Sequence, residues 1–260
     1  SLIMSIFNNV VAKAEYLTSY KIDKNITLIE CNKPNSNGSV SIYLVEGEDK
    51  CLVIDTGYKV DSFLQFVKQH TNKPLILFLT HGHFDHSGNI DDFDTVYMNQ
   101  ADVQMIPNYK GNIVNVKQGY EFDLGKRILK VIDLAGHTPG SLGLLDEENK
   151  ILFCGDAIGN DELWMHITNM PLESILGITD FLIHIQDKFE TIYVGHLLKS
   201  KGPLDLKYII KLNDLVKKIV YGGDFKSEPY KSPFPVKCNP LIVKENGIVI
   251  IYDPSRIHYV

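Results

Sequence analysis

The chain has few of the features that mark several common protein classes. Its four cysteines are scattered through 260 residues without CxxC spacing, which predicts packed free thiols in a reducing compartment rather than a disulfide framework. No apolar run is long enough to span a membrane. Residues 1–11 contain a short apolar patch but lack the regions of a secretory signal. These absences lead us to expect a cytoplasmic protein.

Arginine is also scarce, with Arg127 and Arg256 as the only two in the sequence. A net charge of -6 argues against a nucleic-acid surface spread over the whole protein. Repeats, low-complexity runs and linker-like segments are absent from the sequence, so we expect one domain over residues 1–260. The expected partner is a small-molecule substrate, and the sequence leaves the oligomeric state open.

One stretch is rich in side chains that bind metal ions. His81, His83, Asp85 and His86 follow an apolar run, residues 74–79, whose composition predicts a buried strand. A strand directs alternate side chains to one face, so His81 and His83 are expected to point the same way. Imidazole and carboxylate together form a ligand set that zinc, iron and manganese accept. The stretch therefore predicts a metal site at the end of this strand.

Three further candidate ligands occur singly along the chain. Each one ends an apolar run and directly follows a glycine: they are His137, Asp156 and His196. A glycine lets the backbone approach a crowded centre without a clash from a Cβ atom. The repeated arrangement predicts that these side chains join the same metal site.

The complete pattern resembles the metallo-β-lactamase superfamily. The HxHxDH motif reads His81-x-His83-x-Asp85-His86, and the later ligand positions are His137, Asp156 and His196. Upstream, the apolar strand that ends in Asp55-x-Gly57 also matches the family. The resemblance extends from about Ile26 to His196. It implies an α/β fold, the four-layer αββα sandwich of this superfamily.

The resemblance also implies a role for each ligand. It assigns His81, His83 and His137 to one metal ion, and Asp85, His86 and His196 to a second. Asp156 would bridge two divalent ions, with zinc as the first choice and iron or manganese as alternatives. A hydroxide shared by the two ions would be the nucleophile, because bound metal lowers the pKa of water to about 7. Asp85 is expected to take up the proton, and Asp55 to orient a ligand imidazole.

Differences between branches of the superfamily narrow the reaction. Zinc β-lactamases usually carry cysteine where this chain has Asp156, and flavodiiron proteins have an acidic residue where it has His83. Glyoxalase II-like thioesterases share the HxHxDH motif and the Thr138-Pro139-Gly140 that follows His137. The leading hypothesis is a binuclear metallohydrolase that cleaves a small ester, thioester or lactone. The alternatives are a phosphodiesterase of the same fold and a mononuclear iron oxidoreductase like the persulfide dioxygenases.

Candidate substrate residues lie directly after two of the ligands. Residues 158–166 leave the site from Asp156 and include Trp164 and His166. Lys199 and Lys201 follow His196, where either ammonium group would suit a carboxylate or phosphate. A buried tryptophan, a capping histidine and two solvated lysines remain the alternative interpretation. Two other histidines are expected to lie outside the site: His70 at a helix end and His184 on a helix surface.

Hydrophobic periodicity and turn signals predict the remaining elements. Helices are expected over residues 60–70, 101–106, 172–189 and 204–220. Strands are expected over residues 24–31, 40–45, 51–57, 95–98, 120–122, 127–132, 142–145, 151–153 and 191–195. Two more, residues 240–243 and 248–252, flank Asn246-Gly247, which is a strong hairpin signal.

Overall fold

The computed structural model describes residues 5–260, so residues 1–4 of the amino-terminal apolar patch lie outside the described residues. The first half of the chain forms an eight-stranded sheet in simple chain order. Its strands are β1 (Val10–Ala14), β2 (Leu17–Asp23), β3 (Ile26–Cys31), β4 (Val40–Glu46), β5 (Cys51–Ile54), β6 (Leu75–Phe78), β7 (Thr95–Met98) and β8 (Asn112–Asn115). Pairing is antiparallel from β1 to β5 and parallel from β5 to β8.

A second sheet of five strands has the order β14-β12-β11-β10-β9. These strands are β9 (Glu121–Asp123), β10 (Ile128–Asp133), β11 (Leu142–Asp146), β12 (Ile151–Gly155) and β14 (Thr191–Val194). The pair β12 and β14 is parallel, whereas the other neighbours are antiparallel. Parallel pairing brings the carboxyl ends of β12 and β14 to the same edge of the sheet.

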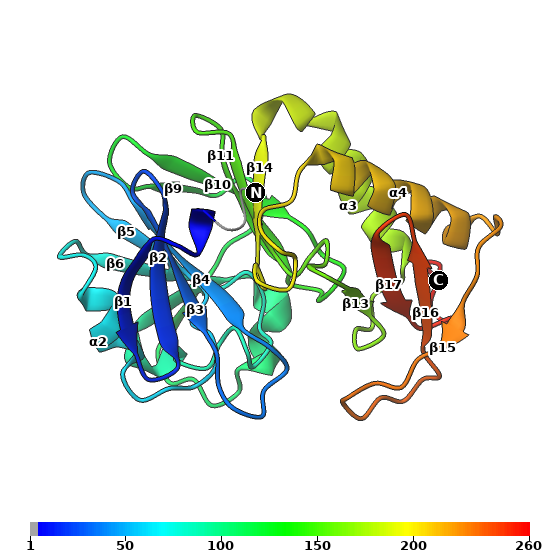
Figure 1. The fold of residues 1–260 in the computed structure, drawn as a ribbon, viewed down its shortest axis with the longest axis horizontal. Helices are drawn as coiled ribbons and strands as arrows, with labels where there is room; N and C mark the ends of the chain where they lie inside the picture. The colour runs from blue at the N-terminus through cyan, green and yellow to red at the C-terminus, as the bar shows by residue number, and fades with distance from the viewer. Residues whose placement is uncertain (1–4) are drawn as a thin grey trace.

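The two sheets pack face to face and helices cover their outer faces. Aromatic contacts such as Tyr43 with Phe153, at 5.3 Å between ring centroids, join the inner faces. Helix α2 (Phe63–Lys68) packs on the outer face of the first sheet, and α3 (Glu173–His184) belongs to the hydrophobic cluster of the second. Helix α4 (Leu206–Val220) packs along α3 (Figure 1). The layers confirm the expected αββα sandwich.

The chain closes with a third, smaller sheet that lies against α4 (Figure 1). Its order is β13-β17-β16-β15, built from β13 (Leu163–Met165), β15 (Glu228–Pro229), β16 (Leu241–Glu245) and β17 (Ile248–Tyr252). The predicted Asn-Gly hairpin joins β16 to β17, with φ of 53° at Asn246 and 81° at Gly247. Strand β13 pairs in parallel with β17, which no local pattern predicted. The single domain over residues 1–260 stays a prediction.

Several element boundaries differ from those expected. Residues 101–106 are a 3-10 helix, η2 (Gln100–Met105), instead of an α-helix. The helix predicted over residues 172–189 ends at His184, and η3 (Gln186–Lys188) follows it. A further short element is η1 (Ile90–Asp92). Strands β1, β2, β8, β13 and β15 were not predicted; of these, β1 and β8 are sheet edges with mostly exposed side chains. No helix among residues 5–260 is long and apolar enough to cross a membrane.

Candidate metal centre

The candidate ligands leave the carboxyl ends of strands from both large sheets. His81 follows β6 of the first sheet after Leu79 and Thr80. Asp156 directly follows β12 of the second sheet, and His196 follows its parallel neighbour β14 after Gly195. Gly195 N donates to Gly155 O, and an added Cβ on Gly195 would lie 2.2 Å from the Asp156 carboxylate. Glycine is therefore required where the second sheet brings its ligands together.

One carboxylate oxygen lies at the middle of this cluster. Asp156 Oδ2 is 3.2 Å from Nε2 of both His86 and His196. The same oxygen is 3.7 Å from Nε2 of His81 and from Nε2 of His137. Four imidazoles from three segments of the chain thus point the same ring nitrogen at a single oxygen atom.

Two groups of donor atoms meet at this centre, and a third group, Asp55 with His81 and His86, overlaps both of them. One group contains His81, His83 and His137, and the other contains Asp85, His86, Asp156 and His196. Within each group the donor atoms lie within 4.8 Å of one another. Asp85 Oδ2 is 3.4 Å from His196 Nε2 and 3.6 Å from His86 Nε2. The structure brings the expected ligand residues together, and their assignment to two ions stays a prediction.

In four of these histidines, Nδ1 makes a hydrogen bond while Nε2 faces Asp156, and this bond fixes the orientation of the ring. The Nδ1 atoms of the rings have these partners: His81 with Thr80 Oγ1 at 2.9 Å, His86 with Asp55 Oδ2 at 2.9 Å, His137 with Trp164 O at 2.8 Å, and His196 with Ser39 O at 2.9 Å. A carbonyl or carboxylate oxygen only accepts, so Nδ1 of His86, His137 and His196 carries a hydrogen, and Nε2 is the ring nitrogen that remains to face the centre. Asp55 has the expected role beside a candidate ligand, and its own Oδ1 accepts from Thr80 N.

Two buried nitrogen atoms test whether these residues fit metal ions. His81 Nε2 and His137 Nε2 have no hydrogen-bond partner among the described residues, although both atoms are buried. A buried polar atom without a partner costs about 1–3 kcal/mol. Unprotonated imidazole and carboxylate groups with converging lone pairs are the donor set of a divalent transition metal. The residues therefore fit metal ions at both groups.

The protonation of the metal-free cluster supports the same interpretation. Burial lowers the pKa of His196, but the carboxylate of Asp156 outweighs burial, and the pKa rises to about 10. Burial likewise lowers the pKa of His86, but the Asp156 carboxylate keeps it well above its ordinary value. Burial and the nearby His137 instead lower the pKa of His83 to about 3. In the metal-free cluster, His86 and His196 beside Asp156 thus hold their protons at neutral pH, whereas His83 stays unprotonated.

Asp102 is a buried carboxylate that the sequence did not single out. It accepts hydrogen bonds from Gly82 N at 2.9 Å, Gly140 N at 2.7 Å and Thr138 Oγ1 at 2.6 Å. These donors belong to the two loops that carry His81 and His137. Asp102 therefore holds the two loops together. Its sequence context, a short turn after β7, contains no metal-site signal.

A cavity of about 440 Å³ opens onto the cluster. His83, Asp85, His137, Asp156 and His196 form its floor. Its walls come from several loops. The lining residues are Asn37, Tyr58, Phe84, Asn160, Asp161, Glu162, Trp164, Ile167, Lys199, Tyr230, Pro233, Phe234 and Pro235. The segment between β15 and β16 was not predicted to contribute, because it is far from the ligands in sequence.

The four predicted substrate residues have different positions. Trp164 and Lys199 line the cavity, and Trp164 Nε1 donates to Glu162 Oε2 at 2.7 Å. His166 lies behind Trp164, with 5.2 Å between ring centroids, and Lys201 is exposed; neither lines this cavity.

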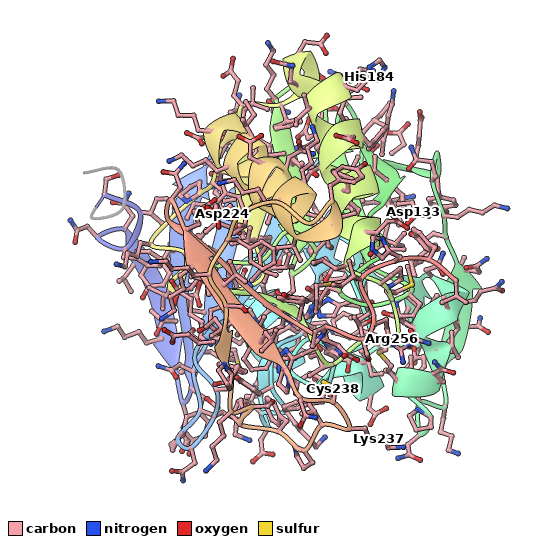
Figure 2. The ribbon with its side chains drawn as sticks, turned by 90° about the vertical axis from the view of Figure 1, so that its right-hand side faces the viewer. Asp133, His184, Asp224, Lys237, Cys238 and Arg256 are labelled. Atoms are coloured by element: carbon pink, nitrogen blue, oxygen red, sulfur yellow. The ribbon has the colours of Figure 1, made fainter. Side chains whose placement is uncertain are left out.

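The two remaining histidines lie outside the cluster. The ring of His70 is half-buried and bonded to Phe66 O and Ser19 Oγ rather than solvated, because it packs between α2 and β2. His184 is exposed at the end of α3 (Figure 2).

Comparisons with known proteins agree with this geometry. Residues 36–196 match the sequence model of the metallo-beta-lactamase superfamily. An acyl-coenzyme A thioesterase of Homo sapiens, MBLAC2, is 26% identical over 206 residues, covering 62% of this chain and 74% of that protein. A hydroxyacylglutathione hydrolase of Francisella philomiragia is 34% identical over 120 residues, covering 45% of this chain and 47% of that protein.

Solved structures show the same fold. A metallo-beta-lactamase family protein from Thermus thermophilus has a TM-score of 0.62 at 18% identity, covering 78% of this chain and 82% of that one. A metallo-beta-lactamase from Pontibacter korlensis has a TM-score of 0.60, also at 18% identity, covering 76% of this chain and 98% of that one. The region that matches the sequence model runs from just before β4 to just after β14, contains every candidate ligand, and shows that the chain belongs to the metallo-beta-lactamase superfamily.

Proposed function

We propose that the protein is a metallohydrolase that holds two divalent ions, zinc being the first choice, and cleaves a small carboxylic ester, thioester or lactone. The observation that carries the proposal is the position of Asp156 Oδ2, 3.2–3.7 Å from Nε2 of four histidines. His81, His83 and His137 would hold one ion and Asp85, His86 and His196 the other, with Asp156 shared. Ions bound there would supply an acidic water molecule and a Lewis acid for a carbonyl oxygen.

The chain's own residues prepare the site for this chemistry. The bonds of the imidazole Nδ1 atoms to Asp55, Trp164 O and Ser39 O keep the Nε2 atoms aimed at the centre. Asp85 lines the cavity; burial raises the pKa of its carboxyl, but the His86 and His196 rings outweigh burial and lower that pKa to about 2. Asp85 is thus ionised at neutral pH, and its carboxylate receives the proton released during attack on the substrate.

The cavity walls favour an acyl substrate over a phosphodiester. Rings of Phe84, Trp164 and Phe234 form an apolar wall, with 5.9 Å between the centroids of Trp164 and Phe234. Among the described residues, Lys199 is the one lysine or arginine that lines the cavity, whereas Asp161 and Glu162 add negative charge beside it. A phosphodiester anion would meet these carboxylates, whereas a neutral acyl group would not. Similarity to a thioesterase and to a hydroxyacylglutathione hydrolase supports a thioester in particular.

Relative activity on two substrate classes tests the proposal. Metal-loaded protein is expected to cleave a carboxylic ester or thioester faster than bis(p-nitrophenyl) phosphate. Lys199→Ala should change ester hydrolysis little, and Lys201→Ala is the matched control because Lys201 lies outside the cavity. A better rate on the phosphodiester, lost selectively in Lys199→Ala, would replace the acyl hydrolase by the phosphodiesterase alternative.

Metal content tests the other alternative, a mononuclear iron oxidoreductase. The second donor group, Asp85, His86, Asp156 and His196, is complete, so we expect about two ions per chain after loading. Elemental analysis of a zinc-loaded and an iron-loaded sample measures this directly. Saturation at one ion in both samples would contradict the two-ion proposal.

A further inference from the structure

Glu30 is a buried carboxylate that belongs to none of the donor groups at the metal centre. It lies in β3, is 4% exposed, and takes part in no ion pair among residues 5–260. Its neighbours on the same face of the strand, Ile26 and Leu28, belong to the hydrophobic cluster that contains residues of both large sheets. Burying a carboxylate is costly unless its oxygen atoms accept hydrogen bonds. A glutamate in this apolar layer therefore indicates a specific contact that an apolar side chain could not make.

Two serine hydroxyl groups occupy the two carboxylate oxygens of Glu30. Ser39 Oγ donates to Oε2 and Ser41 Oγ donates to Oε1, both at 2.6 Å. Both distances are at the short end for hydrogen bonds between oxygen atoms. Ser41 lies opposite Glu30 in the antiparallel pair of β3 and β4, and Ser39 directly precedes β4. Glu30 thus fixes both serines at the start of β4.

The same two serines hold the chain at His196. Ser39 O accepts from Nδ1 of His196 at 2.9 Å. Ser41 Oγ accepts from the backbone N of Leu197, also at 2.9 Å. One contact sets the imidazole ring, and the other sets the backbone that directly follows it. Glu30 therefore acts on His196 through the two serines.

The hydrogen bonds that orient His86 and His137 do not depend on this network. Nδ1 of His86 is bonded to Asp55 Oδ2, and Nδ1 of His137 is bonded to Trp164 O. Neither acceptor belongs to β3 or to the start of β4. Loss of Glu30 should therefore disturb His196 and leave these two rings in place. This selectivity distinguishes the positioning of one ligand from general support of the fold.

We propose that Glu30 is a positioning residue for His196, and that through Ser39 and Ser41 it keeps the imidazole in the orientation in which Nε2 faces Asp156 Oδ2 at 3.2 Å. The inference rests on the proposed function only where it concerns the ion that His196 would hold. The hydrogen bond between His196 and Ser39 O is present in the metal-free protein, so this part of the inference can be tested without an ion.

Proton NMR of the metal-free protein tests the link directly. The Nδ1 hydrogens of His196 and His137 are both bonded to buried carbonyl oxygens, so each should give a downfield resonance that exchanges slowly with water. His196→Asn and His137→Asn assign the two signals. Glu30→Ala should broaden or remove the His196 resonance and leave the His137 resonance in place. A His196 resonance with unchanged position and exchange rate in Glu30→Ala would overturn the inference.

Chelator competition tests the consequence for metal binding. In Glu30→Ala, zinc affinity at the second donor group should fall about 10–100-fold, as for loss of an outer hydrogen-bond partner of a ligand. Affinity at the first group, which contains His81, His83 and His137, should stay at the wild-type value. Equal loss at both groups would contradict a specific effect on His196. If the wild type binds a single ion, the two-ion proposal fails, and the NMR measurement still decides the role of Glu30.

Glu30→Gln separates hydrogen bonding from charge. Glutamine has the same shape, accepts from one serine hydroxyl through its oxygen and donates to the other through its nitrogen. It should therefore restore the His196 resonance and most of the zinc affinity. A glutamine variant as impaired as Glu30→Ala would mean that the charge of Glu30 matters and its geometry does not, which would overturn the inference.

Asn213→Ala is the matched control for stability. Asn213 is 3% exposed and donates to Thr179 Oγ1 at 2.8 Å and to Asp180 Oδ1 at 2.9 Å, between α3 and α4. This variant should lower the melting temperature but leave both zinc affinities and both resonances unchanged.

Ser39→Ala gives the same test if Glu30→Ala does not fold. It removes the hydroxyl that Glu30 binds and keeps the carbonyl that accepts from His196. We expect faster exchange of the His196 resonance with water and weaker zinc binding at the second donor group alone. Wild-type exchange and wild-type zinc affinity in Ser39→Ala would show that Glu30 does not position His196 through Ser39.

Discussion

At the residue scale, Asp156 and Asp102 are both buried carboxylates, but they contact different parts of the centre. Asp156 faces the Nε2 atoms of the histidines, whereas Asp102 accepts from backbone and hydroxyl donors behind them. Burial raises the pKa of Asp156, but the neighbouring imidazoles outweigh burial and hold that pKa well below its ordinary value, so the group is ionised. One residue is placed to hold cations and the other to hold the loops that supply their ligands.

Replacing Asp156 with asparagine should separate metal binding from fold. Asp156→Asn keeps the size of the side chain but removes the charge, so we expect preferential loss of one ion. Turnover should fall by at least ~10²-fold, as for loss of a principal electrostatic group. Elemental analysis and kcat on a thioester measure both effects. Asp161→Asn, in the cavity wall but outside both donor groups, should keep both ions; wild-type turnover by a fully loaded Asp156→Asn would place the chemistry elsewhere.

Removing Asp102 should weaken the metal site without touching a ligand. Asp102→Ala leaves three buried donors, including Gly82 N and Gly140 N, without their acceptor. We expect the free energy of unfolding to drop by about 2–4 kcal/mol and metal affinity to fall by about 10–100-fold. Chelator competition below the melting temperature measures affinity. Asp133→Ala, an exposed residue with one similar bond, should change neither; unaltered metal affinity in Asp102→Ala would mean that the loops need no such support.

The low pKa of His83 predicts acid sensitivity of the metal-free protein. In the unfolded chain the ring takes a proton below about pH 6.5, whereas in the folded protein burial and His137 keep its pKa at about 3. Unfolded chains therefore bind more protons, and stability should decline as the pH falls from about 6.5 toward 3. Urea unfolding in chelator at several pH values measures the slope. His83→Asn should flatten it and exposed His184→Asn should not; equal slopes in all three proteins would refute the assignment.

At the element scale, the segment between β15 and β16 lines the cavity and contacts the HxHxDH loop. Its Phe234 ring lies 6.2 Å from Phe84 and 5.9 Å from Trp164, measured between centroids. Pro233 and Pro235 flank Phe234, and proline restricts the backbone at both positions. A short segment from the third sheet thus completes the apolar wall over a centre built by the other two sheets.

Truncating Phe234 should affect long acyl groups more than short ones. Phe234→Ala removes part of the apolar wall, so we expect KM to rise about 3–10-fold for a hexanoyl thioester, because each buried CH₂ contributes about 0.8 kcal/mol. An acetyl thioester of the same thiol should change little. Steady-state kinetics over a chain-length series measures the difference. Tyr221→Ala, at an exposed ring outside the cavity, should leave the series unchanged; a uniform rise in KM for Phe234→Ala would exclude acyl recognition by this ring.

At the scale of the whole molecule, the centre joins the two large sheets. His81, His83 and His86 come from the loop after β6, whereas His137, Asp156 and His196 follow β10, β12 and β14. Tyr43 of the first sheet reinforces the same junction, with its Oη donating to Val194 O at 2.6 Å. Ions bound between the sheets would add cross-links that the unfolded chain cannot form.

Removal of metal should therefore lower the stability of the whole fold. At a free metal concentration of 100 Kd, one site stabilises the folded state by about 2.7 kcal/mol, which corresponds to a melting-temperature shift of at least about 5 °C. Calorimetry with and without chelator measures the shift. Asp156→Asn should show a smaller one. Identical melting curves for loaded and chelated wild-type protein would mean that the cluster binds no ion.

Interactions between residues that are close in the sequence could be predicted from the sequence. Interactions between distant residues could not. The ligand types, their positions at strand ends, and the Asn246-Gly247 hairpin are encoded in local patterns of a few residues. Such patterns work because strand periodicity, glycine conformations and ligand chemistry depend on neighbouring residues. The αββα sandwich came from the resemblance to a family, and the arrangement of the two sheets confirms it.

Contacts between distant segments were decided only by the tertiary structure. Asp102 reaches Gly140, the β13 strand pairs with β17, and Phe234 packs against Phe84, yet none of these pairs shares a local pattern. The exclusion of Lys201 from the cavity has the same origin. Which side of a loop faces a cavity depends on how the sheets pack, and packing is set by many long-range contacts at once. The sequence alone determined the kind of centre, and the packing of three sheets determined its walls.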